Sequence, residues 1–578
     1  MEPTKVCQNC NKSFTLEEED FELLEKIKVP PPTFCPTCSH QRRFAWRNTH
    51  SLYHRTDSIT GEDIISIYHK DTKMNIVSQE YWWSDAWDPM DYGIEYDFNK
   101  NFFSQWKELR DKIPFQALSN SKAVNSPFCN VAEESYDCYL ISASWKNERT
   151  MYSDSIKEIK DSLDLYVGIK NEFCYENIYC NDSYKLKYSE KSNNCIESFF
   201  LYDCKNSTNC FMSSNLRNKS YVFENRQLNK DEYFREIEKI DLLKYSIIEK
   251  LKISFKELKI NSIHRYATIV NSRDSSGDNI LNSKSCKNCF DFFQNPENCM
   301  HCFWGGVQAK DMYYCGPGMG LGEIFYESFD GAVNGSRNIC TSVVYNSSNV
   351  DYSFNCYNCQ NIFGCIGLRN KSYCILNKQY SKEVYFSLVS KIKEHMNSMP
   401  YVDKASRTYR YGEFFPVELS PFAYNETIAN MFYPLTKEQA LSTGYLWRDP
   451  EEKKYVPTIS IENIPDSIDE VKDNILEDII PCAHLDPTFS RCTSAFRITP
   501  QELSFYRRLK IPLPRLCYQC RHYERFKKRN PLELWERTCM NTFSPIYNGQ
   551  CKNTFKTSYS PDRPEIIYCE ECYKNKVL

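Results

Sequence analysis

The middle of the chain, residues 116–378, consists of short apolar phrases separated by Asn, Ser and Gly. Cysteine often follows Asn in these phrases, as in Asn194-Cys195 and Asn209-Cys210, at irregular intervals. Short strands that alternate with polar turns and recur many times are typical of a parallel β-helix or a related solenoid. In such a stack, equivalent Asn side chains form ladders with a spacing of about 4.8 Å. Cys suits the inward positions because it is small and tolerates burial.

A duplication within this region predicts helices between the strands. Residues 202–234 match residues 354–386 at a constant offset of 152, with 15 of 33 positions identical. Each copy ends in a helix-start signal, in which Asn229 or Ser381 is the expected N-cap and acidic residues follow in the first turn. We therefore expect a helical interlude over 229–264 and a second helix over about 381–396. A further helix is expected over 98–112.

Two CxxC pairs open the chain, Cys7 with Cys10 and Cys35 with Cys38, and 24 residues separate them. Each pair suits a tight knuckle whose two thiolates take two corners of a tetrahedron, so that two knuckles complete the shell of a Zn²⁺ ion. Four sulfur ligands leave no coordination position open. The spacing therefore predicts a structural zinc site.

The same pattern returns near the other end, where residues 492–539 align without a gap on residues 10–57 at an offset of 482. The cysteines of this second predicted zinc site are Cys482, Cys492, Cys517 and Cys520. Cys482 is displaced by an insertion of seven residues in the first knuckle. His484 is a rival for that corner because imidazole is also a good zinc ligand.

A third predicted zinc site uses the next four cysteines of the chain, Cys539, Cys551, Cys569 and Cys572. The corresponding N-terminal positions hold Asp57, Thr60, Ser78 and Tyr81. We expect this N-terminal unit to keep the fold without a metal. Local packing, for example by Trp82 and Trp83, would replace what zinc contributes to folding.

Another set of four cysteines also matches a zinc-site spacing, namely Cys286, Cys289, Cys299 and Cys302. A similar pair, Cys356 and Cys359, corresponds to Cys204 and Ser207 in the other copy of the duplication, so the pair is not kept as a unit. This difference favours buried thiols over a fourth metal site, and the metal alternative stays open. The three assigned sites use all twelve cysteines outside residues 116–378, and 17 lie within that range.

Composition and charge narrow the possible roles. The chain has 578 residues, 29 of them Cys, and a formal net charge of −4, so any nucleic-acid contact would come from local patches. Two stretches of interleaved arginines and aromatic residues follow the first two zinc sites and suit either phosphate contact or a solvated helix face; they include Arg43, Arg47, Arg525 and Arg529.

No apolar run is long enough for a membrane-spanning helix, and the first residues lack the apolar stretch of a signal peptide, so a cytoplasmic location is expected. The motifs GxxxxGKS/T, GxSxG and HExxH do not occur. We therefore expect a protein without enzymatic activity. A β-helix hydrolase or lyase is the weaker alternative.

Several phrases resemble a family of zinc-binding proteins from small-genome candidate-phylum bacteria. They are Pro36-Thr37-Cys38, Trp82-Trp83, Leu216-Arg217-Asn218, Ser420-Pro421-Phe422, Ile511-Pro512-Leu513-Pro514, Arg521-His522-Tyr523 and Asp562-Arg563-Pro564-Glu565. The resemblance covers nearly the whole chain. It implies zinc binding and a cytoplasmic bacterial setting, and it implies no particular activity. Related chains often have a CxxC-like pair in the second N-terminal unit as well, which this chain lacks.

The expected architecture is multidomain and mainly β, with duplicated zinc-ribbon or treble-clef-like modules flanking a two-part parallel β-solenoid with helical insertions. The expected order is a zinc module (1–48), a metal-free copy (49–90), an aromatic and helical collar (91–118), solenoid half one (119–228), the interlude (229–264), solenoid half two (265–380), a helix and extended linker (381–480) and two zinc modules (481–530 and 531–578). This arrangement favours a non-enzymatic scaffold with three zinc ions. Its partner would be a protein, an RNA or a ribonucleoprotein, and the alternative role is nucleic-acid binding by the arginine stretches.

Overall fold

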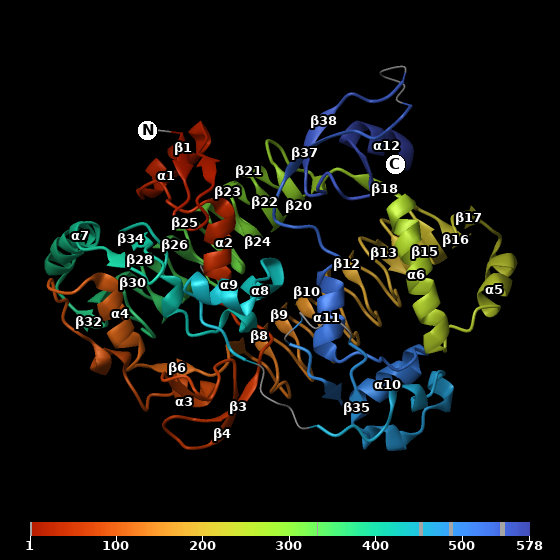
Figure 1. Ribbon diagram of the computed structural model, residues 1–578, viewed down its shortest axis with the longest axis horizontal. Helices are drawn as coiled ribbons and strands as arrows, with labels where there is room; N and C mark the ends of the chain where they lie inside the picture. Colours follow the sequence, from red (N-terminus) through yellow and green to blue (C-terminus); the bar gives the residue numbers. More distant parts are fainter. Residues whose placement is uncertain (1–2, 332, 450–454, 485–488, 490, 544–548) are drawn as a thin grey trace.

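The computed structural model of the protein describes residues 3–331, 333–449, 455–484, 489, 491–543 and 549–578. The fold is mixed α/β and contains two large, mostly parallel sheets, one of 11 strands and one of 12 strands. We call them stack 1 and stack 2. Figure 1 shows them side by side in the middle of the molecule, and the Tyr179 hydroxyl of stack 1 donates a hydrogen bond to Asp291 of stack 2 at 3.2 Å.

Stack 1 consists of the strands β7 (Asn120–Ser121), β8 (Asn130–Glu133), β9 (Ser142–Trp145), β10 (Asp154–Lys157), β11 (Tyr166–Ile169), β12 (Ile178–Asn181), β13 (Asn193–Ile196), β14 (Phe199–Tyr202), β15 (Lys205–Ser214), β16 (Ser220–Phe223) and β17 (Arg226–Gln227).

Stack 2 consists of the strands β19 (Ile269–Val270), β20 (Gly277–Leu281), β21 (Lys284–Lys287), β22 (Cys289–Phe292), β23 (Glu297–Met300), β24 (Phe303–Tyr313), β25 (Met319–Tyr326), β26 (Gly335–Ile339), β28 (Ser348–Asp351), β30 (Gln360–Phe363), β31 (Ser372–Ile375) and β32 (Lys378–Gln379). Two further strands of this part of the sequence, β27 (Ser342–Tyr345) and β29 (Phe354–Tyr357), pair with each other in parallel in a separate small sheet.

The register of stack 1 advances by twelve residues from one strand to the next. Ser142 pairs with Asp154, Asp154 with Tyr166 and Tyr166 with Ile178, always in parallel. The bends between strands keep the same register, since Tyr136 bridges Glu148 and Glu148 bridges Lys160. The regular period was hidden in the sequence because Cys and Asn occupy only some of the repeating positions.

A three-residue rhythm of the backbone underlies this period. Every third residue over long stretches of stack 1 has a positive φ, for example Lys146 (55°), Arg149 (44°) and Tyr152 (53°). The residue after most of these is buried, as Asn147 and Thr150 illustrate. Positive-φ residues thus recur at every third position along these stretches, and we call them corner residues.

This rhythm explains the recurring Asn-Cys phrase. Asn194 (φ 53°) and Asn209 (φ 52°) turn corners, and Cys195 and Cys210 behind them are fully buried. Asn adopts the left-handed conformation more readily than most other residues with a side chain. The predicted inward place of Cys is therefore confirmed for the 17 central cysteines, all of which are buried.

The predicted Asn ladders are also present. The Asn194 amide donates to the Asn206 side-chain oxygen at 2.8 Å, and Asn206 donates in turn to Asn218 at 2.9 Å. Inside the stack, serine hydroxyls accept bonds from backbone amides one repeat away, as Ser153 does from Leu165 at 2.9 Å. These serine hydroxyls and backbone amides are thereby paired inside the repeat.

The two ends of the chain repeat one order of elements. The N-terminal copy comprises β1 (Thr4–Val6), β2 (Ser13–Thr15), α1 (Glu18–Ile27), α2 (Pro36–Phe44), β3 (Tyr53–Thr56), β4 (Asp63–Ser66), β5 (Asn75–Val77) and α3 (Gln79–Trp83). The C-terminal copy comprises β35 (Ile480–Pro481), β36 (Ala495–Phe496), α10 (Pro500–Leu509), α11 (Tyr518–Phe526), β37 (Trp535–Thr538), β38 (Thr554–Thr557), β39 (Ile566–Tyr568) and α12 (Glu570–Val577).

Each copy lies against both stacks. Strand β5 pairs in parallel with β6 (Pro114–Gln116), which leads into stack 1, and β39 pairs in parallel with β18 (Ile263–Arg265), which leads into stack 2. The helix of each copy contacts the other stack, because α2 lies on stack 2 and α11 lies on stack 1 (Figure 1). The N-terminal copy therefore bridges the two stacks, and so does the C-terminal copy.

The predicted helices are present close to their expected bounds. They are α4 (Phe102–Arg110), α5 (Lys230–Glu238), α6 (Tyr245–Asn261) and α7 (Lys382–Ser398). Asn229 and Ser381 are the N-caps of α5 and α7, as expected, and each side chain accepts a backbone N–H in the first turn. The segment after α7 contains β33 (Tyr401–Val402), β34 (Thr408–Tyr409), α8 (Ile428–Phe432) and α9 (Lys437–Ser442).

Parts of two expected features, the extended stretch after residue 449 and the insertion in the C-terminal knuckle, lie outside the described residues. Across the described ranges, no helix combines the length and apolar character needed to span a membrane.

The corner conformation can be tested at the exposed Asn206, whose φ is 51°. Asn206→Val places a β-branched side chain in the left-handed region and removes the ladder bonds, so it should lower the free energy of unfolding by about 1–2 kcal/mol. Asn206→Gly, which fits that conformation, should cost less. Urea unfolding followed by circular dichroism measures both, with Thr208→Val in strand β15 as the control. A valine variant as stable as the parent would contradict this account of the corners.

Candidate metal centres

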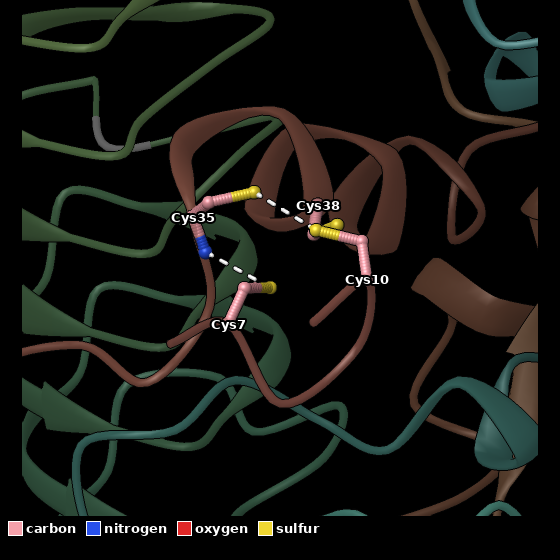
Figure 2. A group of neighbouring side chains, drawn as sticks. All are labelled: Cys7, Cys10, Cys35 and Cys38. Atoms are coloured by element: carbon pink, nitrogen blue, oxygen red, sulfur yellow. Dashed lines mark hydrogen bonds between the residues drawn. The ribbon is translucent and has the colours of Figure 1, made fainter. Parts of the chain in front are cut away.

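The first cysteine group lies where the β1–β2 hairpin meets the start of α2. Cys7 and Cys10 sit on the hairpin turn, Cys35 is the N-cap of α2, and Cys38 is in its first turn. Figure 2 shows the four side chains converging, with Cys10 and Cys35 Sγ atoms 3.8 Å apart. All four sulfur atoms lie within 4.8 Å of one another.

The second and third groups have the same construction. Cys517 and Cys569 are the N-caps of α11 and α12, as Cys35 is of α2. The Sγ atoms of Cys482 and Cys520 are 3.8 Å apart, and those of Cys551 and Cys569 are 3.9 Å apart. The structure thus brings together all twelve cysteines predicted from the sequence, in the three predicted groups.

The spacing of the sulfur atoms fits zinc. A tetrahedron with Zn–S bonds of about 2.3 Å has edges of about 3.8 Å between its sulfur atoms. One Sγ–Sγ distance in each group, 3.8, 3.8 and 3.9 Å respectively, matches this edge. All three groups can therefore hold a metal ion with four thiolate ligands, and zinc is the metal that such a ligand set favours.

One hydrogen bond recurs in all three groups. The backbone N–H of the N-cap cysteine donates to the first cysteine of the group: Cys35 to Cys7 at 3.3 Å, Cys517 to Cys482 at 3.2 Å and Cys569 to Cys539 at 3.3 Å. Side-chain amides add to this, with Asn9 donating to Cys38 at 3.2 Å and Asn553 donating to Cys569 at 3.5 Å. Such bonds, and the positive end of the helix, stabilise negative charge on sulfur.

Each group contains at least one thiol with a lowered pKa, whereas other thiols, such as Cys38, Cys482 and Cys539, have a raised pKa. The pKa of the Cys7 thiol is lowered, first by hydrogen bonds from the Cys35 and Cys38 side chains. The hydrogen bond from Cys482 is the main cause that lowers the pKa of the Cys492 thiol to about 7. The thiolate is the metal-binding form, so a bound cation would also have to favour ionisation of the thiols whose pKa is raised.

The choice between Cys482 and His484 falls on Cys482. The Cys482 sulfur belongs to the second group, whereas the His484 ring packs against Phe489 with the ring centroids 5.5 Å apart. The described residues therefore give this group four sulfur ligands.

In the second N-terminal unit a carboxylate stands where the sister unit has the first cysteine of its group. Asp57 stands at the position of Cys539, and it accepts the backbone N–H of Ser78 at 2.7 Å, as Cys539 accepts that of Cys569. The same carboxylate accepts the amides of Ile59 and Thr60 at 2.8 and 2.9 Å. Burial alone would raise the pKa of Asp57, but these backbone bonds lower it overall. Asp57 therefore ties the two loops that zinc could tie in the sister unit.

Packing by the tryptophans, which was expected to stabilise this unit in place of a metal, contributes only part of that stabilisation. Trp82 is fully buried, and its indole N–H donates to the carbonyl of Pro114 at 3.2 Å, whereas Trp83 is 45 % exposed. Ser78 caps α3 by accepting the N–H of Tyr81 at 3.1 Å.

The fourth cysteine set is part of the stack 2 core. Cys286 and Cys299 lie on neighbouring strands, and their thiols donate to the backbone carbonyls of Lys284 and Glu297 at 3.5 and 3.3 Å. Among the described residues, the groups whose ligand atoms converge within 4.8 Å are the three above, and this set is not one of them. This geometry favours the interpretation as buried thiols.

The two arginine stretches do not form a phosphate-binding surface, which corrects that expectation. The side chains of Arg43, Arg47, Arg525 and Arg529 are 0, 5, 2 and 6 % exposed. All four make ion pairs with buried or nearly buried carboxylates of the stacks, and the partners are Glu327, Asp330, Asp164 and Asp291. Contact with a nucleic acid would require breaking these pairs.

The carboxylates that receive the arginines were missed from the sequence. Glu327 of stack 2 accepts from both Arg42 and Arg43 of α2, at 2.7 and 2.5 Å. Asp164 of stack 1 accepts a hydrogen bond from Arg521 of α11 at 2.8 Å and forms an ion pair with Arg525 at 2.9 Å. No motif marks these acids, and hundreds of residues separate them from their partners.

No protein-family model matches the sequence, and no curated protein matches it. A solved structure described as an acetyltransferase from Desulfovibrio desulfuricans G20 is similar over 43 % of this chain, at 11 % identity and a TM-score of 0.10. The similar region spans 62 % of the length of that structure's chain. This likeness carries no argument about fold or activity. The comparisons identify no family, so the resemblance drawn from the sequence stays an expectation.

The role of Asp57 can be tested by Asp57→Asn, which keeps the shape but removes the charge and one acceptor. The variant should lose about 1–3 kcal/mol of unfolding free energy, because a buried N–H loses its partner. Its zinc content should equal that of the parent protein. Asp63→Asn, on the exposed edge of β4, is the control. An Asp57 variant with unchanged stability would show that the carboxylate does not hold these loops.

Proposed function

We propose that the protein is a non-enzymatic scaffold in which three structural zinc ions fix small modules onto two β-solenoid halves. The observation that carries the proposal is that each cysteine group offers a full set of four ligands. Each has four sulfur ligands within 4.8 Å of one another, supplied by two loops of the chain. A zinc ion with four thiolates has no position left for water or substrate, which is the hallmark of a structural site.

The solenoid part of the proposal rests on the repeat geometry. A register of twelve residues, a left-handed corner at every third residue and side chains stacked in ladders all fit a chain that coils around one axis. Such a coil is rigid along its length, because each repeat rests on its neighbours. Rigidity of this kind suits a spacer or an assembly surface.

The proposal places the protein in a reducing compartment such as the cytoplasm. All 29 cysteines are free, and oxidation of the twelve clustered ones would compete with zinc binding. A protein or a ribonucleoprotein remains the proposed partner. It would bind surfaces other than the arginine-bearing faces of α2 and α11, which are occupied by the stacks.

Metal analysis of the purified full chain tests the proposal. We expect three zinc ions per chain, and two after Cys35→Ser, Cys517→Ser or Cys569→Ser, because each variant removes one ligand set. Cys286→Ser is the matched control, since it changes a buried cysteine of the stack 2 core and should leave three zinc ions bound. Fewer than three ions in the parent protein, or a loss of zinc in the control, would contradict the assignment.

A further inference from the structure

The segment that follows α7 contacts both loops that supply the first cysteine group. Gln8, beside Cys7, donates from Nε2 to the carbonyl of Thr408 at 3.1 Å, and the Thr408 N–H donates back to Gln8 Oε1 at 2.8 Å. Glu413 accepts the backbone N–H of Thr33 at 3.1 Å, just before the second knuckle. A segment far along the chain therefore surrounds this group from outside.

The side-chain amide of Asn9 links the cysteine group directly to this segment. Asn9 lies between the two cysteines of the first knuckle, and its Nδ2 donates to Cys38 Sγ at 3.2 Å. Arg407 Nη1 donates to Asn9 Oδ1 at 2.6 Å. A guanidinium group has donors only, so the amide oxygen must face Arg407, and the amide NH₂ group is thereby turned toward the sulfur. Arg407 thus fixes the orientation of a donor to a cysteine ligand.

Arg407 is itself held firmly in place. Asp403 accepts from its Nε at 2.6 Å and from its backbone N–H at 2.9 Å, and the Thr443 carbonyl accepts from its Nη2 at 2.8 Å. The side chains of Arg407 and Asp403 are 3 and 1 % exposed. Because Asp403 balances the positive charge, Arg407 acts on the cysteine group through the geometry of Asn9.

The second cysteine group is built differently at the equivalent position. At the offset of 482 residues, the counterpart of Asn9 is Arg491. Its guanidinium donates to the backbone carbonyls of Asn425, at 3.1 Å, and of Thr427. Among the described residues, the path from an arginine through an amide to a sulfur is therefore a feature of the first group and not of the second.

We propose that Arg407, acting through Asn9, is a positioning residue that controls how firmly the first cysteine group retains its zinc ion, which rests on the proposed function that the group holds zinc. Four thiolates around Zn²⁺ carry excess negative charge, and an N–H donor aimed at one sulfur stabilises that charge. Removing such a partner of a metal ligand lowers metal affinity by about 10–100-fold. Loss of either side chain should therefore weaken the first site and leave the other two unchanged.

Transfer of zinc from the loaded full chain to a chromogenic chelator tests this role. Arg407→Met removes the guanidinium, so one zinc ion should leave about 10–100-fold faster than from the parent protein. Asn9→Asp keeps an acceptor for Arg407 but removes the donor to sulfur, and it should have a similar effect. Arg410→Met, the same change at an exposed arginine of the same segment, is the matched control and should release zinc as the parent does.

Cadmium NMR of the cadmium-loaded full chain shows which site is affected. Cys35→Ser assigns the resonance of the first group by removing it, and Arg407→Met should shift that resonance alone, which a general loss of stability would not do. Circular dichroism shows whether each variant is folded, and if Arg407→Met is not, the Asn9→Asp result decides. Release rates and cadmium shifts that match the parent in the folded variants would overturn this role. Absence of zinc from the first group of the parent would instead contradict the proposed function.

Discussion

The structure depends on buried ion pairs between the two knuckle helices and the stacks. Arg42 and Arg43 of α2 share Glu327, which is 1 % exposed, and Arg521 and Arg525 of α11 share Asp164, which is fully buried. Such charges are stable only when the partner stays in place, and removing one partner of a buried pair costs about 3–5 kcal/mol. The helices must therefore be held rigidly, and a cysteine group lies at the N-terminus of each.

This dependence gives the zinc sites a role beyond their own modules. In each copy a metal ion would fix the start of a helix, the helix would place two arginines, and the arginines would neutralise an acid that a stack could not otherwise bury. Because α2 serves stack 2 while β5 pairs with the strand leading into stack 1, the N-terminal copy joins both stacks. The C-terminal copy also joins both stacks, because α11 contacts stack 1 while β39 pairs with the strand that leads into stack 2.

The sequence was most informative where the chemistry is local. Spacing and the duplication of the chain ends identified the twelve converging cysteines, and local signals located the N-caps Asn229 and Ser381. The twelve-residue period was missed, although intervals such as Cys174 to Cys180 and Cys195 to Cys204 are multiples of three and could have revealed it. The arginines were read as solvated or phosphate-binding, because their acidic partners come from distant repeats and only the folded chain brings them together. The substitution of Asp57 for a metal ligand was likewise visible only in its hydrogen bonds.

Hydrogen–deuterium exchange of the full chain, before and after zinc is removed with a chelator, tests the central claim most directly. If the metal sites hold the knuckle helices in place, protection should fall in β24 and β25 beneath α2 and in β11 beneath α11, as well as in the modules themselves. If the loss of protection is confined to the modules and the stacks keep theirs, the stacks do not depend on these helices and the account is wrong.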